Sequence, residues 1–139
     1  RFRAEHGISR FHGEWAYCRS VAGIALDRRL RFGAGGGAGD IGWFVGGVRT
    51  VRGQIAGTQD GDAFWLARAE VGTKQGVFRP VGFFDVGSAG SRNAFGKLKP
   101  QRGTGIGIGV LDGLIRVDFS RGLYPLKQWR TDFYLSAAL

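Results

Sequence analysis

The sequence has few of the residues on which disulfide-bonded domains, metal sites and most enzymes depend. It contains one cysteine (Cys18), two histidines (His6 and His12) and no methionine. A single cysteine excludes an intrachain disulfide and a cysteine-based metal cluster. Only three of the 139 residues are proline, which argues against a disordered tail rich in proline and glycine. We therefore expect neither a metal site nor a cofactor.

Long apolar runs and long charged runs are also absent. No stretch reaches the roughly 18 apolar residues of a transmembrane helix, although the strands of a transmembrane β-barrel would carry a much weaker signal. The net charge is +9, yet the 20 lysines and arginines are spread along the chain rather than gathered in one block. The chain begins at Arg1 without an initiating methionine or a signal peptide, so we expect it to be a piece of a longer protein.

Glycine and apolar residues are abundant. There are 26 glycines, and hydrophobic residues make up 43% of the chain and aromatic residues 13%. Each glycine inside a helix costs about 1 kcal/mol relative to alanine, so long stable helices are disfavoured. The apolar content is too high for a disordered segment. These proportions predict a folded, all-β chain.

Alternation of apolar and polar residues recurs along the chain with a period of two. It is clearest near the end, where Trp129, Phe133, Leu135 and Leu139 share one face and Asp132 lies on the other. The same pattern predicts an antiparallel meander of about seven strands joined by turns. Residues 88–102 are expected to form a loop, and residues 34–62 the longest connection. The expected strands are 11–21, 24–33, 64–74, 77–86, 105–110, 114–121 and 129–139.

Alternation alone does not decide which face is buried. A soluble β-domain points its apolar side chains inward, whereas a transmembrane barrel points them at lipid and encloses charges in a wet lumen. Four aromatic residues near strand ends favour the barrel, because such residues form interfacial girdles. They are Trp15, Tyr17, Trp65 and Trp129. The charged faces also mix both signs, which suits a confined lumen.

The segment 46–54, GGVRTVRGQ, resembles the motif of the sixth extracellular loop in the BamA-like superfamily. That group, the bacterial surface antigen barrel family, comprises outer-membrane assembly factors and two-partner secretion transporters with POTRA domains. Its pattern is two glycines, a short spacer, then Val-Arg-Gly followed by an aromatic residue, and Gln54 replaces the aromatic here. The residues that carry the motif are Gly46, Gly47, Val51, Arg52 and Gly53.

Further segments follow in the order of that family. LARAE at 66–70 resembles the strand after the loop, and VGFFDVG at 81–87 resembles the next strand's signature. Residues 105–109 and 114–118 are similar to the following hairpin. Residues 129–139 resemble the closing strand, which serves as the recognition signal for barrel assembly. The resemblance covers about residues 46–139.

The resemblance implies a fold and a site. Residues 1–139 would be the C-terminal part of a transmembrane β-barrel in the bacterial outer membrane, with 34–62 an extracellular loop folded into the barrel. Arg52 would be the tip of that loop, and Glu70 and Asp85 its partners on the wall. An arginine fork binds carboxylates bidentately, so such a contact fixes both position and orientation.

The implied function is the insertion of outer-membrane proteins or the translocation of polypeptides. The implied partners are the lipid bilayer, unfolded polypeptide clients, and further barrel strands and POTRA domains of the same chain. Another outer-membrane pore, or a barrel linked to a patatin-like passenger, remains an alternative. POTRA repeats upstream would favour assembly or transport, and a Gly-x-Ser-x-Gly passenger would favour a lipase.

A soluble basic β-domain that binds nucleic acid or another acidic ligand is the second alternative. It requires aromatic and basic residues on the same exposed face. Here Phe119 and Phe133 alternate away from Arg116 and Arg130, so we expect no nucleic-acid partner. We also expect no enzyme, because the sequence has no Gly-x-Ser-x-Gly, no metal-ligand cluster and no phosphate-binding loop.

Overall fold

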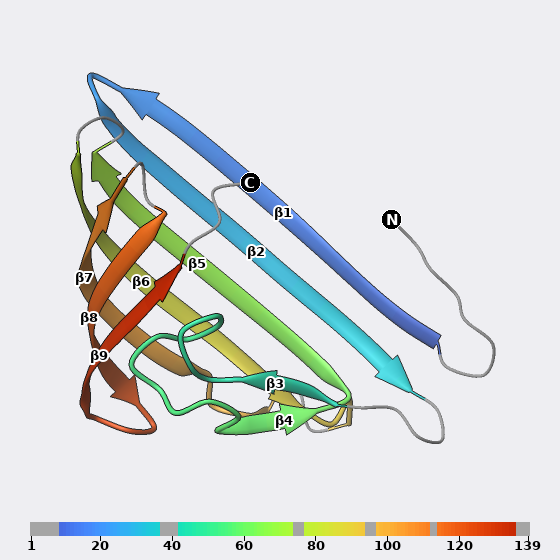
Figure 1. The fold of residues 1–139 in the computed structure, drawn as a ribbon. Coiled ribbons are helices and arrows are strands. Elements are labelled where there is room, and N and C mark those ends of the chain that lie inside the picture. The colour runs from blue at the N-terminus through green and yellow to red at the C-terminus, as the bar shows by residue number, and fades with distance from the viewer. Residues whose placement is uncertain (1–8, 37–41, 74–76, 94–96, 112–113, 136–139) are drawn as a thin grey trace.

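The computed structural model describes residues 9–36, 42–73, 77–93, 97–111 and 114–135, and nearly all of them lie in strands (Figure 1). Seven strands form one antiparallel sheet in which each strand pairs with the next one along the chain, apart from a short excursion after β2. This confirms the predicted all-β meander of about seven strands. The seven strands are β1 (Ser9–Val21), β2 (Ile24–Gly36), β5 (Ala63–Thr73), β6 (Phe78–Gly90), β7 (Gln101–Val110), β8 (Ile115–Tyr124) and β9 (Trp129–Leu135).

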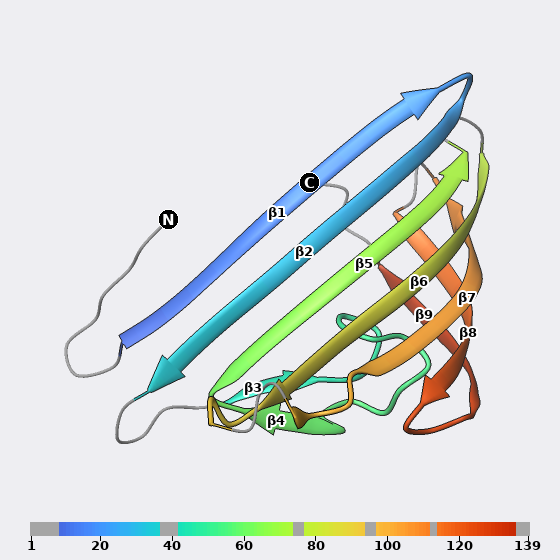
Figure 2. The same ribbon diagram turned by 180° about the vertical axis from the view of Figure 1, so that it is seen from behind.

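The excursion contains a small hairpin that the sequence did not predict. β3 (Trp43–Val45) pairs with β4 (Gln59–Gly61), and residues 46–58 form the turns between them. Figures 1 and 2 show this hairpin and its turns on one side of the curved sheet only, the concave side. β3 contacts β5 and β6, and β4 contacts β6. The connection therefore folds back over the sheet.

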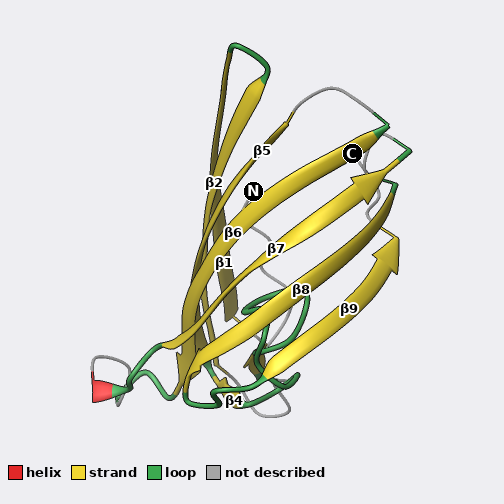
Figure 3. Ribbon diagram, turned by 90° about the vertical axis from the view of Figure 1, so that its left-hand side faces the viewer, coloured by secondary structure: helices red, strands yellow, loops and turns green. Residues whose placement is uncertain are grey.

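The sheet is curved but not closed (Figure 3). β1 and β9 are its two edges, and no described residues pair with them on their outer sides. We call the end of the sheet at the β1–β2 turn the hairpin end, and the opposite end, where β2 leads into the excursion, the loop end. No helix within the described ranges is long and apolar enough to cross a membrane.

Several strands extend further toward the loop end than predicted. Ser88–Gly90 belong to β6 and Gln101–Arg102 to β7, although the sequence placed them in a loop at 88–102. Likewise β2 continues through Gly36. Glycine-rich strand ends resemble turns in sequence, but these glycines stay in the ladder, where neighbouring strands approach them closely. A Cβ atom on Gly87, for example, would meet the backbone and side chain of the adjacent strand.

The sheet carries its apolar side chains on the convex face. Phe133 and Leu135 are each 76% exposed, whereas Asp85 and Asp118, which point to the concave face, are 0% exposed. This distribution is the reverse of a soluble domain, in which apolar side chains are buried and charges face water. The small apolar core, which includes Val51 and Leu66, lies between the excursion and the wall. The concave face therefore holds both the loop and the buried charges.

Candidate functional site

The turn before the loop tip is built by backbone contacts and glycines. The amide of Gly46 donates to Thr50 Oγ1 at 2.8 Å, and the amide of Gly47 donates to the Val51 carbonyl at 3.1 Å. Gly46, Gly47 and Gly53 have φ values of +119°, +93° and +83°, which residues with a Cβ rarely adopt. Val51 anchors the turn in the apolar core. The tip residue, Arg52, is thereby directed at the sheet.

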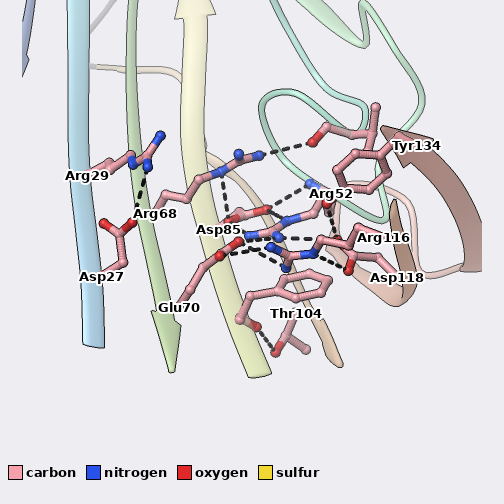
Figure 4. A network of polar contacts seen from close by, with 12 residues as sticks. Asp27, Arg29, Arg52, Arg68, Glu70, Asp85, Thr104, Arg116, Asp118 and Tyr134 are labelled. Carbon is pink, nitrogen blue, oxygen red and sulfur yellow. Dashed lines mark hydrogen bonds and ion pairs between the residues drawn. The ribbon is translucent and has the colours of Figure 1, made fainter. Parts of the chain in front are cut away.

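Arg52 binds Asp85 of β6 through a two-pronged ion pair (Figure 4). Its Nε lies 2.6 Å from Asp85 Oδ2, and its Nη2 lies 2.7 Å from Oδ1. The backbone amide of Arg52 also donates to Oδ2, at 3.1 Å. Both side chains are buried, at 1% and 0% exposure. Such charge-assisted, bidentate bonds fix the orientation of the loop as well as its position.

The remaining guanidinium nitrogen reaches two more carboxylates. Nη1 of Arg52 donates to Glu70 Oε1 on β5 and, at 3.2 Å, to Asp118 Oδ2 on β8. The guanidinium carbon also lies 3.5 Å from the centre of the Phe83 ring, in cation–π contact. The structure thus places Arg52 against both carboxylates named from the sequence, Glu70 and Asp85. Asp118 is a third partner, which the sequence does not indicate.

Arg68, on the strand wall, also binds the loop. Arg68 of β5 donates from Nη2 to the carbonyls of Val48 and Thr50, at 3.1 and 2.8 Å, and its Nε lies 3.3 Å from Asp85. Arg68 therefore holds the loop backbone while Asp85 holds the loop tip. Its role was not predicted, because the sequence showed only one more charge on an inward face.

Arg116 and Tyr134 support the carboxylates from β8 and β9. Arg116 lies 3.0 Å from Glu70 and 2.7 Å from Asp118, and the Tyr134 hydroxyl donates to Asp118 at 2.6 Å. Three arginines therefore face three carboxylates, so the formal charges cancel. We call these residues the Arg52 cluster. Its members are Arg52, Arg68, Glu70, Asp85, Arg116, Asp118 and Tyr134.

Burial and charge act on Arg52 in opposite directions. Desolvation favours the neutral guanidine, but the hydrogen bond to Asp85 and the charges of Asp85, Glu70 and Asp118 outweigh it, so the pKa of Arg52 is raised above its ordinary value. The guanidinium remains charged and occupies the space between the three carboxylates.

Within the described ranges no group of three or more histidine, cysteine, aspartate or glutamate residues could hold a metal ion.

Gln54 is a second anchor of the loop. It is fully buried, and its Nε2 donates to the carbonyls of Arg102 and Leu126 at 3.0 and 3.1 Å. The amide of Leu126 donates in turn to Gln54 Oε1, at 3.3 Å. One side-chain amide therefore ties the loop to the start of β7 and to the turn between β8 and β9. In sequence, Gln54 differs from the family pattern only by standing at an aromatic position, and that difference does not indicate an anchor.

The predicted closing-strand residues lie away from this cluster. Trp129, Phe133 and Leu135 are exposed on the convex face, and Trp129 stacks on Phe119 with ring centres 4.8 Å apart. Leu139 lies outside the described residues. The structure therefore joins the loop motif with Glu70 and Asp85, and separates both from the apolar side of β9.

A scan against protein-family models gives no match to this chain, and a search of curated proteins gives none. The features of the chain that indicate a function are therefore the geometry of the Arg52 cluster and the distribution of charge across the sheet.

Proposed function

We propose that this chain is the C-terminal barrel segment of a bacterial outer-membrane protein that inserts outer-membrane proteins or translocates polypeptides. The observation that supports this most is the loop tip Arg52, buried among Glu70, Asp85 and Asp118 on the concave face of a sheet whose convex face is apolar. This arrangement agrees with the inward-folded loop of the bacterial surface antigen family, which the motif at 46–54 resembles.

The exposed convex face supports a membrane environment. Its residues include Ile106, Ile108 and Phe133, each more than half exposed, and the apolar band continues from β7 to β9. Lipid would cover this face, and water would fill the charged concave side. Because an open sheet leaves backbone groups unpaired at β1 and β9, additional strands of the same protein would complete the barrel.

The Arg52 cluster would hold the loop inside the lumen. It joins the loop to β5, β6 and β8 at once, through one arginine from the loop and residues of three strands. Removing one partner of a buried ion pair costs about 3–5 kcal/mol, because the remaining charges stay buried and unpaired. The loop would therefore keep one shape while clients assemble against the barrel or pass through it.

A passive pore is the second candidate, and a charged cavity beside the cluster favours it. The cavity has a volume of about 320 Å³, and arginines outnumber carboxylates on its wall. Its charged lining consists of Asp27, Arg29, Arg31, Arg49, Arg68, Glu70 and Arg116. A pore would conduct anions in planar bilayers without delivering any polypeptide client.

The test compares Arg52→Ala with Arg49→Ala in the complete protein. Arg49 is exposed in the same loop and contributes no ion pair among the described residues. We expect Arg52→Ala to impair the delivery of clients and the heat resistance of the barrel, and Arg49→Ala to leave both near wild type. Unchanged delivery and unchanged heat resistance in Arg52→Ala would remove the loop from the proposed mechanism.

A further inference from the structure

Charged side chains are divided unequally between the two faces of the sheet. Where the strands of the seven-stranded sheet are described with their side chains, every carboxylate points to the concave face. These carboxylates are Glu14, Asp27, Glu70, Asp85, Asp118 and Asp132. On the convex face of these described strands, only arginines are charged. They are Arg19 and Arg28 toward the hairpin end, and Arg102 and Arg121 at the loop end.

The two arginines at the loop end lie on adjacent strands beside an aromatic platform. Arg102 is opposite Tyr124 in the ladder, and Arg121 is opposite Trp129. The Arg121 guanidinium lies 5.3 Å from the centre of the Trp129 ring, which stacks on Phe119 with an interplanar angle of 15°. Arg121 therefore borders the loop-end edge of an apolar surface, and Arg102 lies on the adjacent strand at the same end of the sheet.

Neither cation is neutralised by the described part of the chain. Arg102 and Arg121 are exposed and take part in no ion pair among the described residues, and the convex face offers no carboxylate there. Arginine above an aromatic ring keeps its edge nitrogens free to bind two oxygens of one anion. An anion for this pair must come from outside the described sheet.

An apolar groove begins beside the platform. It has a volume of about 470 Å³ and lies in the convex face between β6, β7 and β8. Phe119 belongs both to the groove and to the stack under Arg121. Ile106, Ile108 and Val117 line it further from the loop end, and Gly82 leaves room at its floor. A molecule that fills both features has an anionic head and an apolar tail.

We propose that Arg102, Arg121 and Trp129 bind the phosphate monoester headgroup of a lipid, whose acyl chain lies along the groove. Two guanidinium groups match the charge of roughly −1.5 to −2 on a phosphate monoester. Tryptophan and arginine are both favoured at the level of lipid headgroups. This inference rests on the proposed function, because only a membrane-embedded sheet presents its convex face to lipid.

The experiment reconstitutes the complete protein in phosphatidylcholine vesicles that contain about a tenth phosphatidic acid. The protein is then extracted in mild detergent, and its bound lipids are measured by mass spectrometry. With about 1 kcal/mol for each arginine near the headgroups, the ratio of phosphatidic acid to phosphatidylcholine among the bound lipids should be about tenfold or more above the ratio set by its share of the vesicle. The double variant Arg102→Gln with Arg121→Gln should bind it only in proportion to that share.

The matched control is Arg29→Gln with Arg49→Gln, which removes the same charge from the concave side. The control should keep the enrichment, and an equal loss in both variants would overturn the site in favour of net charge. Phosphatidylglycerol, a phosphodiester, should be enriched less than phosphatidic acid. Equal enrichment of the two lipids would overturn the preference for a monoester.

Insertion is measured separately, by resistance of the vesicle-bound protein to carbonate extraction. A protein that inserts but shows no enrichment of phosphatidic acid contradicts this inference alone. A protein that stays in solution contradicts the proposed function as well.

Discussion

Gly53 at the loop tip lies directly against Gly122 of β8, so closely that a Cβ atom on Gly53 would stand 2.5 Å from the Gly122 amide nitrogen. A Cβ atom on Gly122 would in turn collide with the Leu126 carbonyl and the Gln54 side-chain amide. On β7, Gly103 meets the Arg52 carbonyl in the same way. The loop therefore rests on glycines of two strands, and the tip reaches its carboxylates only because those strands carry no side chain there.

Gly122→Ala should release the loop tip. The added methyl group meets backbone atoms that cannot move without shifting the β8–β9 turn. We expect a protease to cleave residues 46–58 faster in this variant than in the wild type. Gly82→Ala is the control, since a Cβ atom there meets nothing nearer than 3.8 Å. Equal cleavage rates in the two variants would contradict the close packing of the loop.

Arg52→Lys should behave like a loss of the residue rather than a conservative change. Lysine keeps the charge, but its single ammonium group cannot bind both oxygens of Asp85 while reaching Glu70 and Asp118. We expect Arg52→Ala to lower the free energy of unfolding by about 3–5 kcal/mol, with Arg52→Lys closer to it than to wild type. Urea unfolding of the reconstituted protein measures the difference. Full stability of the lysine variant would show that charge alone suffices.

Gln54→Glu should be more damaging than Gln54→Ala. Alanine leaves the carbonyls of Arg102 and Leu126 without their donor, at a cost of about 1–3 kcal/mol. Glutamate adds a buried negative charge that faces the same two carbonyls. The order of unfolding midpoints should therefore be wild type, then Gln54→Ala, then Gln54→Glu. A glutamate variant as stable as wild type would mean that water reaches this side chain.

Ile106→Lys distinguishes lipid from water on the convex face. Ile106 is 67% exposed in the middle of β7. If that face met water, a lysine there would leave the free energy of unfolding almost unchanged. In a bilayer the same change should cost up to about 2–4 kcal/mol. Ile55→Lys is the comparison, because Ile55 is half exposed in the loop on the concave side. Equal stabilities of both variants in vesicles would argue against lipid contact at β7.

The number of strands and the face of most residues follow from alternation, because a period of two depends only on local backbone geometry. The loop-end limits of β6 and β7 could not be predicted from alternation. Glycines such as Gly87 and Gly103 resemble turn residues in sequence, yet here they lie where another chain segment comes close. Their role depends on a contact with residues far along the chain.

The site was accessible from the sequence only in part. The resemblance at 46–54 pointed to Arg52, Glu70 and Asp85, whereas Asp118 looked like any other inward charge. Which inward carboxylates converge depends on the stagger of four strands and on the depth of the loop, and neither is encoded in one segment. Nothing in the sequence identified Gln54 as an anchor, since its partners are backbone carbonyls, which every residue has.

The partners of the loop tip also impose an order of events on folding. Arg52 bonds to Asp118, 66 positions later, and Gln54 bonds to Leu126, 72 positions later. Neither contact can exist until β8 and its following turn have joined the sheet, and closing spans of this length is slow compared with forming a local hairpin. A loop bound to its partners thus shows that β8 and the following turn have joined the sheet. An unbound loop shows that folding is incomplete.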